Sequence, residues 1–151
     1  GGAAKRAYHH TAPVNDLYAL HESLLVLKEE GLENAWSRHQ LHHRALVAGL
    51  EAMGLSMLVN EPARLPQLNL VAIPEGVDDA AVRSLLLSDF NLEIGAGLGS
   101  LAGKAWRIGL MGYACNQQNV LLCLMALETV LKSCGASIRV DKALAAAKSV
   151  Y

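Results

Sequence analysis

The sequence IGAGLGSLAGKAWRIG, residues 94–109, is the most informative stretch of this chain. A strand-like apolar run enters a loop with four glycines, and a second apolar run, which carries one arginine, leaves it. Glycine allows positive φ angles and a close approach of the backbone to a ligand or to another chain. We therefore predict a strand over residues 91–94, a glycine loop, and a further strand over residues 105–110.

Helices are expected on both sides of this region. Leucines at spacings of three and four predict two long helices in the first third of the chain. Asp78 and Asn116 are good N-caps, so each is expected to begin another helix. The four expected helices cover residues 15–31, 33–53, 78–88 and 116–135.

Two more strands are expected over residues 55–59 and 68–73. The resulting order is two helices, then strand, strand, helix, strand, strand and helix. This order is typical of an α+β domain with a small, mostly antiparallel sheet covered by helices. We divide the chain into an N-terminal arm over residues 1–13, a small domain over residues 14–135, and a tail over residues 136–151 without an assigned structure.

Composition predicts a globular domain. The chain has 151 residues, of which 52% are hydrophobic and 18% are charged, so it can bury a core. Its net charge is −1, and no long block of like charges occurs, which argues against binding to nucleic acid or to a charged membrane surface. No apolar run reaches the ~18 residues of a membrane-spanning helix, and residues 1–7 lack the hydrophobic core of a secretory signal.

The three cysteines, Cys115, Cys123 and Cys134, form no CxxC pair. An odd number of unpaired cysteines is typical of reduced thiols, so we expect an intracellular protein. The cytoplasm is the first expectation, and a mitochondrion or a peroxisome stays open. The last residues do not form a peroxisomal signal of the SKL type.

The glycine loop fits neither of two nucleotide-binding motifs. A dinucleotide fingerprint needs a later third glycine and a helix after the loop, whereas a strand is expected here. A P-loop needs glycine where Leu98 stands, and Ser or Thr where Ala105 follows Gly103-Lys104. We therefore do not expect a nucleotide at this loop.

Arg107 is the strongest candidate for a binding residue. It lies between Trp106 and Ile108, and arginine is rarely buried without a partner. A guanidinium can hold a substrate carboxylate through two parallel hydrogen bonds. An ion pair with Glu93 or with another carboxylate of the chain explains the same pattern, and both interpretations stay open.

The first third of the chain contains all six histidines. His39 lies one helical turn from His42 and His43, so a metal site is geometrically possible. Because no further ligand pattern accompanies these residues and Arg38 and Arg44 flank them, we expect solvated or interfacial histidines and no metal.

Four segments together resemble one enzyme family. They are YHHTAPV at 8–14, GLENAW at 31–36, EIGAGLG at 93–99 and GKAWRIGLMG at 103–112. The chain resembles the alanine–glyoxylate and serine–pyruvate aminotransferases, which are class V, fold-type I enzymes that use pyridoxal 5'-phosphate. The resemblance runs from Tyr8 to Lys132, and it implies the C-terminal domain of such an enzyme.

The resemblance also implies roles for single residues. Arg107 corresponds to the arginine that binds the substrate's α-carboxylate. Tyr8 and Thr11 correspond to residues that reach the cofactor phosphate of the partner subunit in a homodimer. Gly97 and Gly99 would bring backbone close to the mouth of the active site.

One departure limits what this chain can do. In the family, the lysine that holds the cofactor, the aspartate that pairs with its ring nitrogen and the aromatic that stacks on the ring precede the YHHT segment. This chain lacks that region, so we expect it to be a fragment that is inactive alone and does not bind the cofactor stably. The parent enzyme is expected to move an amino group from alanine or serine to glyoxylate or pyruvate.

Two alternatives to this aminotransferase stay open. One is a noncatalytic α+β module for regulation or dimerisation, because fold does not determine function. The other is the equivalent domain of a class V lyase, with which the arginine is also compatible. In the isolated chain, exposed leucines of the first helices are expected to favour self-association.

Overall fold

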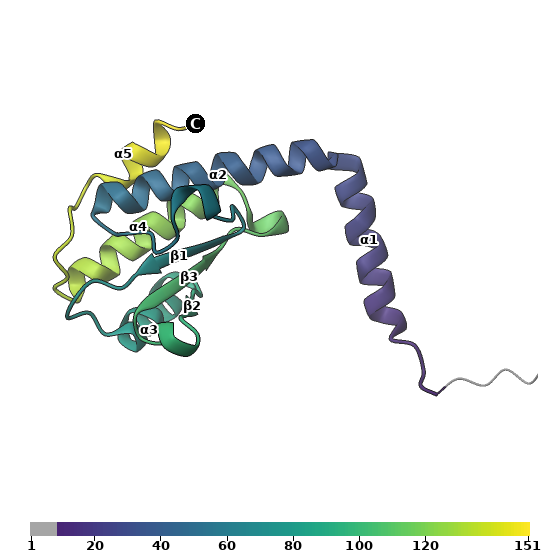
Figure 1. The fold of residues 1–151 in the computed structure, drawn as a ribbon, viewed down its shortest axis with the longest axis horizontal. Helices are drawn as coiled ribbons and strands as arrows, with labels where there is room; N and C mark the ends of the chain where they lie inside the picture. The colour runs from purple at the N-terminus through teal and green to yellow at the C-terminus, as the bar shows by residue number, and fades with distance from the viewer. Residues whose placement is uncertain (1–8) are drawn as a thin grey trace, which may run out of the picture. The chain divides into compact units, whose positions relative to one another are not determined.

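The computed structural model describes residues 9–151, so the sequence prediction for Tyr8 lies outside the described residues. The chain forms two compact units, and the boundary along the sequence lies between Ala35 and Trp36. Figure 1 shows the elements of both units along the chain. The first unit contains helix α1, Val14–Glu30, and the start of α2, Leu32–Met53.

Helix α1 is an apolar helix without a covered face within its own unit. It has no buried residue, and seven of its large hydrophobic side chains are exposed. Gly31 ends the helix with a φ of 86° and donates its N–H to the carbonyl of Leu27. The exposed side chains are Val14, Leu17, Tyr18, Leu20, Leu24, Leu25 and Val26.

The second unit contains a three-stranded antiparallel sheet with the strand order β1-β3-β2. The strands are β1, Leu68–Ala72, β2, Gly95–Ala96, and β3, Ala105–Gly109. In β3, the central strand, Arg107 lies opposite Leu70 of β1 and opposite Gly95 of β2. Three short 3-10 turns occur in this unit, at Glu61–Ala63, Gly99–Leu101 and Gly112–Ala114.

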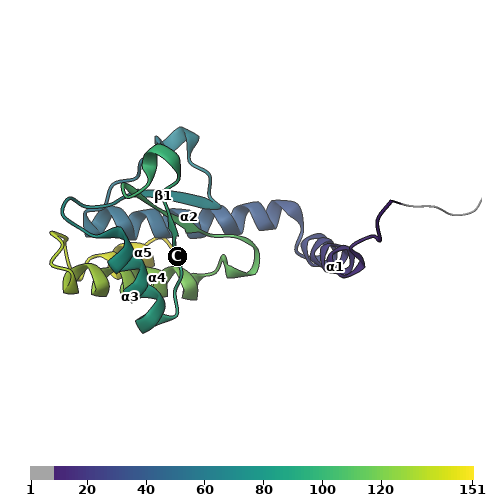
Figure 2. The same ribbon diagram turned by 90° about the horizontal axis from the view of Figure 1, so that it is seen from below.

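Helices α2 and α4, Gln117–Ser133, pack together over the core. A Cβ at Gly49 of α2 would lie 2.4 Å from a methyl of Leu124, so glycine is needed for this close approach. Fully buried apolar side chains from both helices and from the sheet meet here, including Leu46, Leu50, Val71, Trp106 and Leu127. In Figure 1, α4 lies behind the strands and α2 runs above them, and Figure 2 shows β1 on one side of both helices.

Both sequence-predicted N-caps are confirmed. The side chain of Asp78 accepts the N–H of Ala81 at the start of α3, Asp79–Phe90. The side chain of Asn116 accepts the N–H of Asn119 at the start of α4. The predicted α+β class with a small antiparallel sheet is confirmed as well.

Two predicted strands are wrong. Over residues 55–59 the structure has only an isolated bridge between Met57 and Val71. Residues 91–94 form no strand, because Asn91 ends α3 in the left-handed conformation, with a φ of 50°. The strand begins instead at Gly95, inside the segment that we interpreted as the loop.

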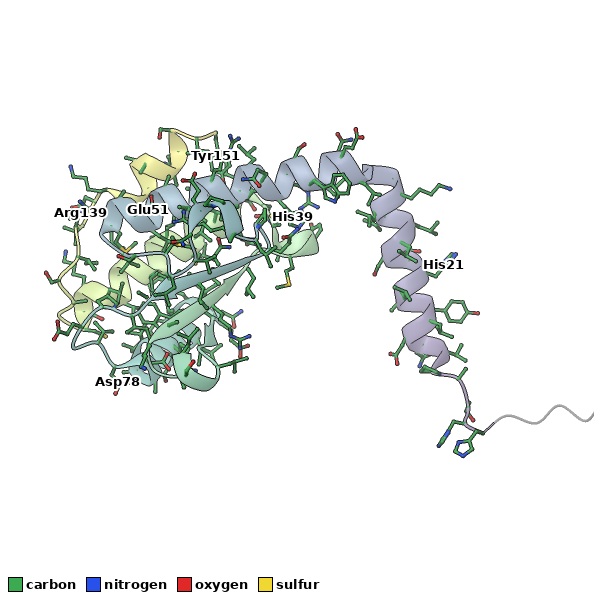
Figure 3. All side chains as sticks on the ribbon, viewed as in Figure 1. His21, His39, Glu51, Asp78, Arg139 and Tyr151 are labelled. Atoms are coloured by element: carbon green, nitrogen blue, oxygen red, sulfur yellow. The ribbon has the colours of Figure 1, made fainter. Side chains whose placement is uncertain are left out.

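The C-terminal residues, which the sequence left unassigned, pack against the core. They form a short helix, α5, Ala143–Lys148, in which Ala143 and Ala147 are fully buried. Before it, the guanidinium of Arg139 donates to the carbonyl of Glu51 at the end of α2, and both residues are labelled in Figure 3. None of the helices in the described part of the chain is long and apolar enough to cross a membrane.

Candidate functional site

Arg107 lies on the face of the sheet that points away from the core. Successive side chains of a strand point to opposite faces, and Trp106 and Ile108 of β3 are buried in the core. Arg107 therefore shares the other face with Leu70, which is half-buried, and with the position of Gly95. The candidate site is this face of the sheet, at its central strand.

The guanidinium of Arg107 is fixed at one nitrogen. Its Nε donates to the carbonyl oxygen of Ala96 at 2.7 Å. Within residues 9–151, no carboxylate forms an ion pair with Arg107, so the alternative partner Glu93 does not fill this role there. The two terminal nitrogens are the pair that can hold a carboxylate in the bidentate manner.

Gly97 and Gly99, which we predicted to lie close to the active site, must be glycine for different structural reasons. A Cβ at Gly97 would lie 2.0 Å from the carbonyl oxygen of Leu101, so the loop's own backbone requires glycine. Gly99 has a φ of +56° and no neighbour within 4 Å of a built Cβ, so the backbone conformation requires it. The presence of glycine at positions 97 and 99 is thus explained within the loop.

Gly95 is the neighbour of Arg107 that the sequence interpretation missed. A Cβ at this position would lie 3.1 Å from Nη2 of Arg107 and 3.3 Å from its Cζ. The available signal was the pairing of two antiparallel strands, which places residue 95 opposite residue 107. Because we placed the strand at residues 91–94, we read Gly95 as part of the loop.

On the core side, a polar cluster attaches β3 to α3. The indole N–H of Trp106 donates to the carboxylate of Asp79 at 2.9 Å. Arg83, one turn along α3, donates to the same carboxylate from Nε at 2.8 Å and from Nη2 at 3.2 Å. These hydrogen bonds hold the pKa of Asp79 below its ordinary value, with the bond from Arg83 as the largest cause.

The lowered pKa predicts a loss of stability in acid. A carboxyl group whose pKa is lower in the folded state stabilises the fold above its unfolded pKa of about 3.9, and this contribution falls as the pH drops below that value. We expect Asp79→Asn to lose about 1–2 kcal/mol at pH 7, with the difference from the parent chain shrinking towards pH 3. Urea unfolding of the 151-residue chain at several pH values measures this.

Glu75→Gln, a change at an exposed carboxylate before α3, is the control and should be as stable as the parent chain at every pH. A difference between Asp79→Asn and the parent chain that stays constant from pH 7 to pH 3 would contradict the role assigned to Asp79.

A second buried polar contact joins α2 to the sheet. Asn69 of β1 is 1% exposed, and its Oδ1 lies 2.7 Å from Nδ1 of His43 on α2, so the ring donates from Nδ1. The amide nitrogen of Asn69 donates to the carbonyl of Ile108, next to Arg107, at 3.3 Å. Helix α2 is therefore attached to the backbone of the strand that carries Arg107.

Of the two expectations for the histidines of α2, solvated or interfacial, the structure contradicts the first. His39, His42 and His43 are all buried. The Nδ1 of His42 lies 3.0 Å from the hydroxyl of Tyr151, which Figure 3 labels near α5. Burial, and then the charge of Arg38, lower the pKa of His42. Among residues 9–151, no group of three or more His, Cys, Asp or Glu side chains could hold a metal ion.

Thr11 lies in the first unit, and its side chain is exposed. No hydrogen bond of the Thr11 hydroxyl occurs among the described residues, so the hydroxyl can donate to a phosphate.

The described lysines do not fit the residue that anchors pyridoxal phosphate. Such a lysine is usually desolvated, which lowers its pKa. Every lysine in the described part of the chain is exposed: Lys28, Lys104, Lys132, Lys142 and Lys148. The described residues therefore fit contacts to a substrate carboxylate and a phosphate, and they do not fit the covalent attachment of a cofactor.

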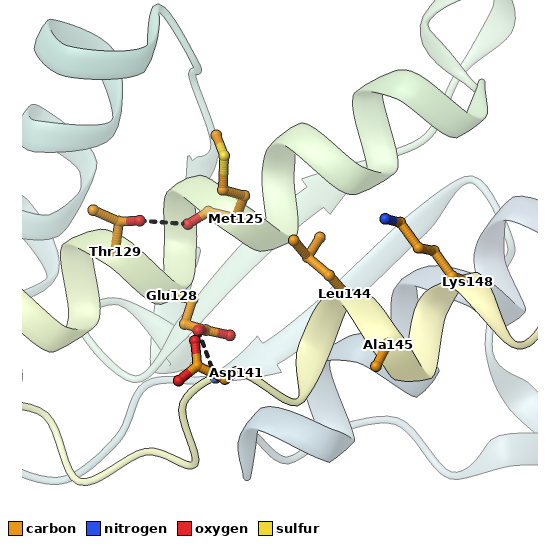
Figure 4. Close-up of a pocket in the computed structure, with 7 residues that line it drawn as sticks. All are labelled: Met125, Glu128, Thr129, Asp141, Leu144, Ala145 and Lys148. Carbon is orange, nitrogen blue, oxygen red and sulfur yellow. Dashed lines mark hydrogen bonds between the residues drawn. The ribbon is translucent and has the colours of Figure 1, made fainter.

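An open pocket of about 530 Å³ lies between α4 and α5 (Figure 4). It is lined by Met125, Glu128, Thr129, Asp141, Leu144, Ala145 and Lys148. The carboxylate of Glu128 already accepts the backbone N–H of Asp141 at 2.8 Å. The pocket shares no lining residue with the face that carries Arg107.

Comparison with known proteins shows that the chain is similar to part of several aminotransferases. It is 46% identical over 147 residues to the (S)-ureidoglycine–glyoxylate transaminase of Bacillus subtilis, covering 97% of this chain and 35% of that protein. It is 45% identical over 130 residues to the alanine–glyoxylate aminotransferase of Callithrix jacchus, covering 85% and 31%. The chain thus spans about a third of the length of these curated relatives, and no family model matches it.

Solved structures agree with this result. The ureidoglycine–glyoxylate aminotransferase of Bacillus subtilis has a TM-score of 0.90 at 47% identity, covering 95% of this chain and 37% of that one. The pyridoxamine–pyruvate aminotransferase of Mesorhizobium loti also has a TM-score of 0.90, at 30% identity, covering 96% and 37%. The resemblance found in the sequence is confirmed, since the matched part is the C-terminal portion of these enzymes.

Proposed function

We propose, from the homology of this chain to the C-terminal portion of class V aminotransferases, that it is part of an enzyme that uses pyridoxal 5'-phosphate. The whole protein is proposed to move an amino group from alanine or serine to glyoxylate or pyruvate. The observation that supports the proposal best is Arg107, with one nitrogen fixed by Ala96 and no carboxylate partner among the described residues.

Arg107 acts by binding and orientation. Its two terminal nitrogens hold the α-carboxylate of the amino acid, and this contact determines which bond at the α-carbon faces the cofactor. Pyridoxal phosphate, when bound, supplies the electron sink that stabilises the carbanion. None of the described lysines is proposed to be the lysine that moves the proton, and the exposure of Lys28, Lys104, Lys132, Lys142 and Lys148 agrees with this.

The arm is proposed to complete the site of a second subunit. Tyr8 and Thr11 are the proposed ligands of the cofactor phosphate, through hydroxyl hydrogen bonds. This role requires a homodimer, and the exposed apolar side chains of α1 agree with burial against further protein. We propose an intracellular, most simply cytoplasmic, location for the assembled enzyme.

The names of the relatives guide the choice of substrates. Both curated relatives described above are named for glyoxylate, one with alanine and the other with ureidoglycine as the partner. Glyoxylate is therefore the first acceptor to test. Alanine, serine and (S)-ureidoglycine are the donors to compare, with pyruvate as the second acceptor.

The test compares the 151-residue chain with the whole protein that contains it. We expect the whole protein to turn yellow with pyridoxal phosphate and to transaminate glyoxylate, and the 151-residue chain to stay colourless. Absorbance after gel filtration measures retained cofactor, and product analysis by mass spectrometry measures transfer. Release of ammonia or of the side chain without transfer would indicate a class V lyase, and a colourless whole protein would support a noncatalytic module.

A further inference from the structure

We infer that Gly95 is a positioning residue for Arg107, and that its missing side chain keeps the guanidinium in the orientation that binds the carboxylate. This inference rests on the proposed function of Arg107.

The register of the sheet places position 95 beside Arg107. Gly95 and Arg107 lie directly opposite each other in the antiparallel pair of β2 and β3. Side chains of directly opposed residues point to the same face, with their Cβ atoms about 4.5–5.5 Å apart. Any side chain at position 95 would therefore stand beside the arginine, on the face that has no core to cover it.

A side chain at position 95 would contact the guanidinium of Arg107. A Cβ at position 95 would lie 3.1 Å from Nη2, 3.3 Å from Cζ and 3.3 Å from Nε of Arg107. The three distances to one planar group mean that the guanidinium lies across the α-carbon of Gly95. These distances are shorter than an ordinary carbon contact of about 3.5–4.0 Å, so a methyl group would displace the guanidinium.

Strand β2, which contains Gly95, also fixes the guanidinium of Arg107. Its Nε donates to the carbonyl of Ala96, the residue after Gly95, at 2.7 Å. Strand β2 thus supplies both an acceptor that sets the plane of the guanidinium and an open space that lets it reach that acceptor. The terminal nitrogens then keep a fixed direction for the ligand.

The backbone conformation at position 95 does not explain why a glycine stands there. Its φ lies outside the left-handed range, in contrast to Gly99 and Gly103 in the same loop. Other residues can therefore adopt this backbone, and the need for glycine comes from the space beside Arg107.

The chain offers a matched control in Gly109. It lies on β3 with an ordinary backbone conformation, two residues from Arg107, and a Cβ there would meet only the terminal methyl of Met111, at 3.6 Å. Gly109→Ala makes the same chemical change in the same sheet without touching the guanidinium.

The experiment measures steady-state kinetics of the whole enzyme with alanine and glyoxylate. We expect Gly95→Ala to raise the KM for alanine about 3- to 10-fold with kcat within about 2-fold, because the change affects placement of the carboxylate ligand. Gly95→Val should raise it further, and Gly109→Ala should leave it unchanged.

A second readout does not depend on activity. In nitrogen-15 spectra of the 151-residue chain, Gly95→Ala should shift the Nε–H signal of Arg107 and speed its exchange with water, whereas Gly109→Ala should do neither. The dispersion of the backbone signals reports whether each variant is folded. If Gly95→Val fails to fold, the spectra and the kinetics of Gly95→Ala still test the inference.

The two hypotheses fail in different ways. An unchanged KM for alanine in Arg107→Ala contradicts the proposed function. A raised KM in Arg107→Ala, together with a Gly95→Ala variant that equals Gly109→Ala in KM and in the Nε–H signal, overturns the inference about Gly95 alone.

Discussion

Replacing Arg107 by alanine in the whole enzyme is expected to lower kcat/KM for the amino donor by about 10- to 150-fold, because hydrogen bonds to charged groups contribute about 1.5–3 kcal/mol. The loss should appear mainly in KM if the carboxylate contact is equally strong in the bound substrate and in the transition state. Steady-state kinetics with alanine and with glyoxylate measure both parameters, since each substrate carries a carboxylate.

Two variants make this result specific. Arg107→Lys keeps the charge and loses the planar fork, so its kcat/KM should fall between that of the parent enzyme and that of Arg107→Ala. Arg44→Ala removes an exposed arginine of α2, and its kinetics should equal those of the parent enzyme. If Arg107→Ala and Arg44→Ala have equal kinetics, Arg107 does not bind the substrate.

The sequence was sufficient to predict Arg107 between two buried neighbours on a strand, because this pattern is local. An arginine between Trp106 and Ile108 needs a partner, and strand alternation alone separates it from its buried neighbours. The same local logic identified the N-caps Asp78 and Asn116, since each cap is a contact with the third residue that follows.

The sequence did not reveal contacts that depend on strand register. Gly95 lies against Arg107 only because β2 begins at that glycine and not four residues earlier. The error came from residues 91–94, in which polar and apolar residues alternate as in a strand, whereas Asn91 turns the chain out of α3 in the left-handed conformation. A shift in the start of a strand changes which residue opposes the arginine, and the alternating pattern of residues 91–94 favoured the wrong start.

The buried histidines were missed for a related reason. Because no metal-ligand pattern accompanies His42 and His43, we expected solvated or interfacial side chains, without a partner inside the chain. Their partners, Tyr151 and Asn69, come from distant parts of the chain. A buried polar side chain is tolerated where it is hydrogen-bonded, and such long-range partners appear only in the folded structure.

Gly97→Ala is expected to destabilise the second compact unit by about 3 kcal/mol, because the added methyl has no space. Its Cβ would lie 2.0 Å from the carbonyl oxygen and 2.7 Å from the carbonyl carbon of Leu101, and 3.1 Å from the carbonyl oxygen of Ala105. All three atoms belong to the backbone, so no side-chain rotation relieves the overlap. The loop must move, and the N–H of Gly97, which donates to Ala105 at 2.8 Å, moves with it.

The neighbouring glycines make this prediction selective. Gly99→Ala has space for the methyl but keeps a φ of +56°, so it should cost about 1–2 kcal/mol. Gly109→Ala has neither problem and should be as stable as the parent chain. Urea unfolding of the three variants, followed by circular dichroism, should therefore rank Gly97→Ala below Gly99→Ala and Gly99→Ala below Gly109→Ala. If Gly97→Ala is as stable as Gly109→Ala, the packing of the glycine loop does not explain Gly97, and a contact with a ligand becomes the better reason for this glycine.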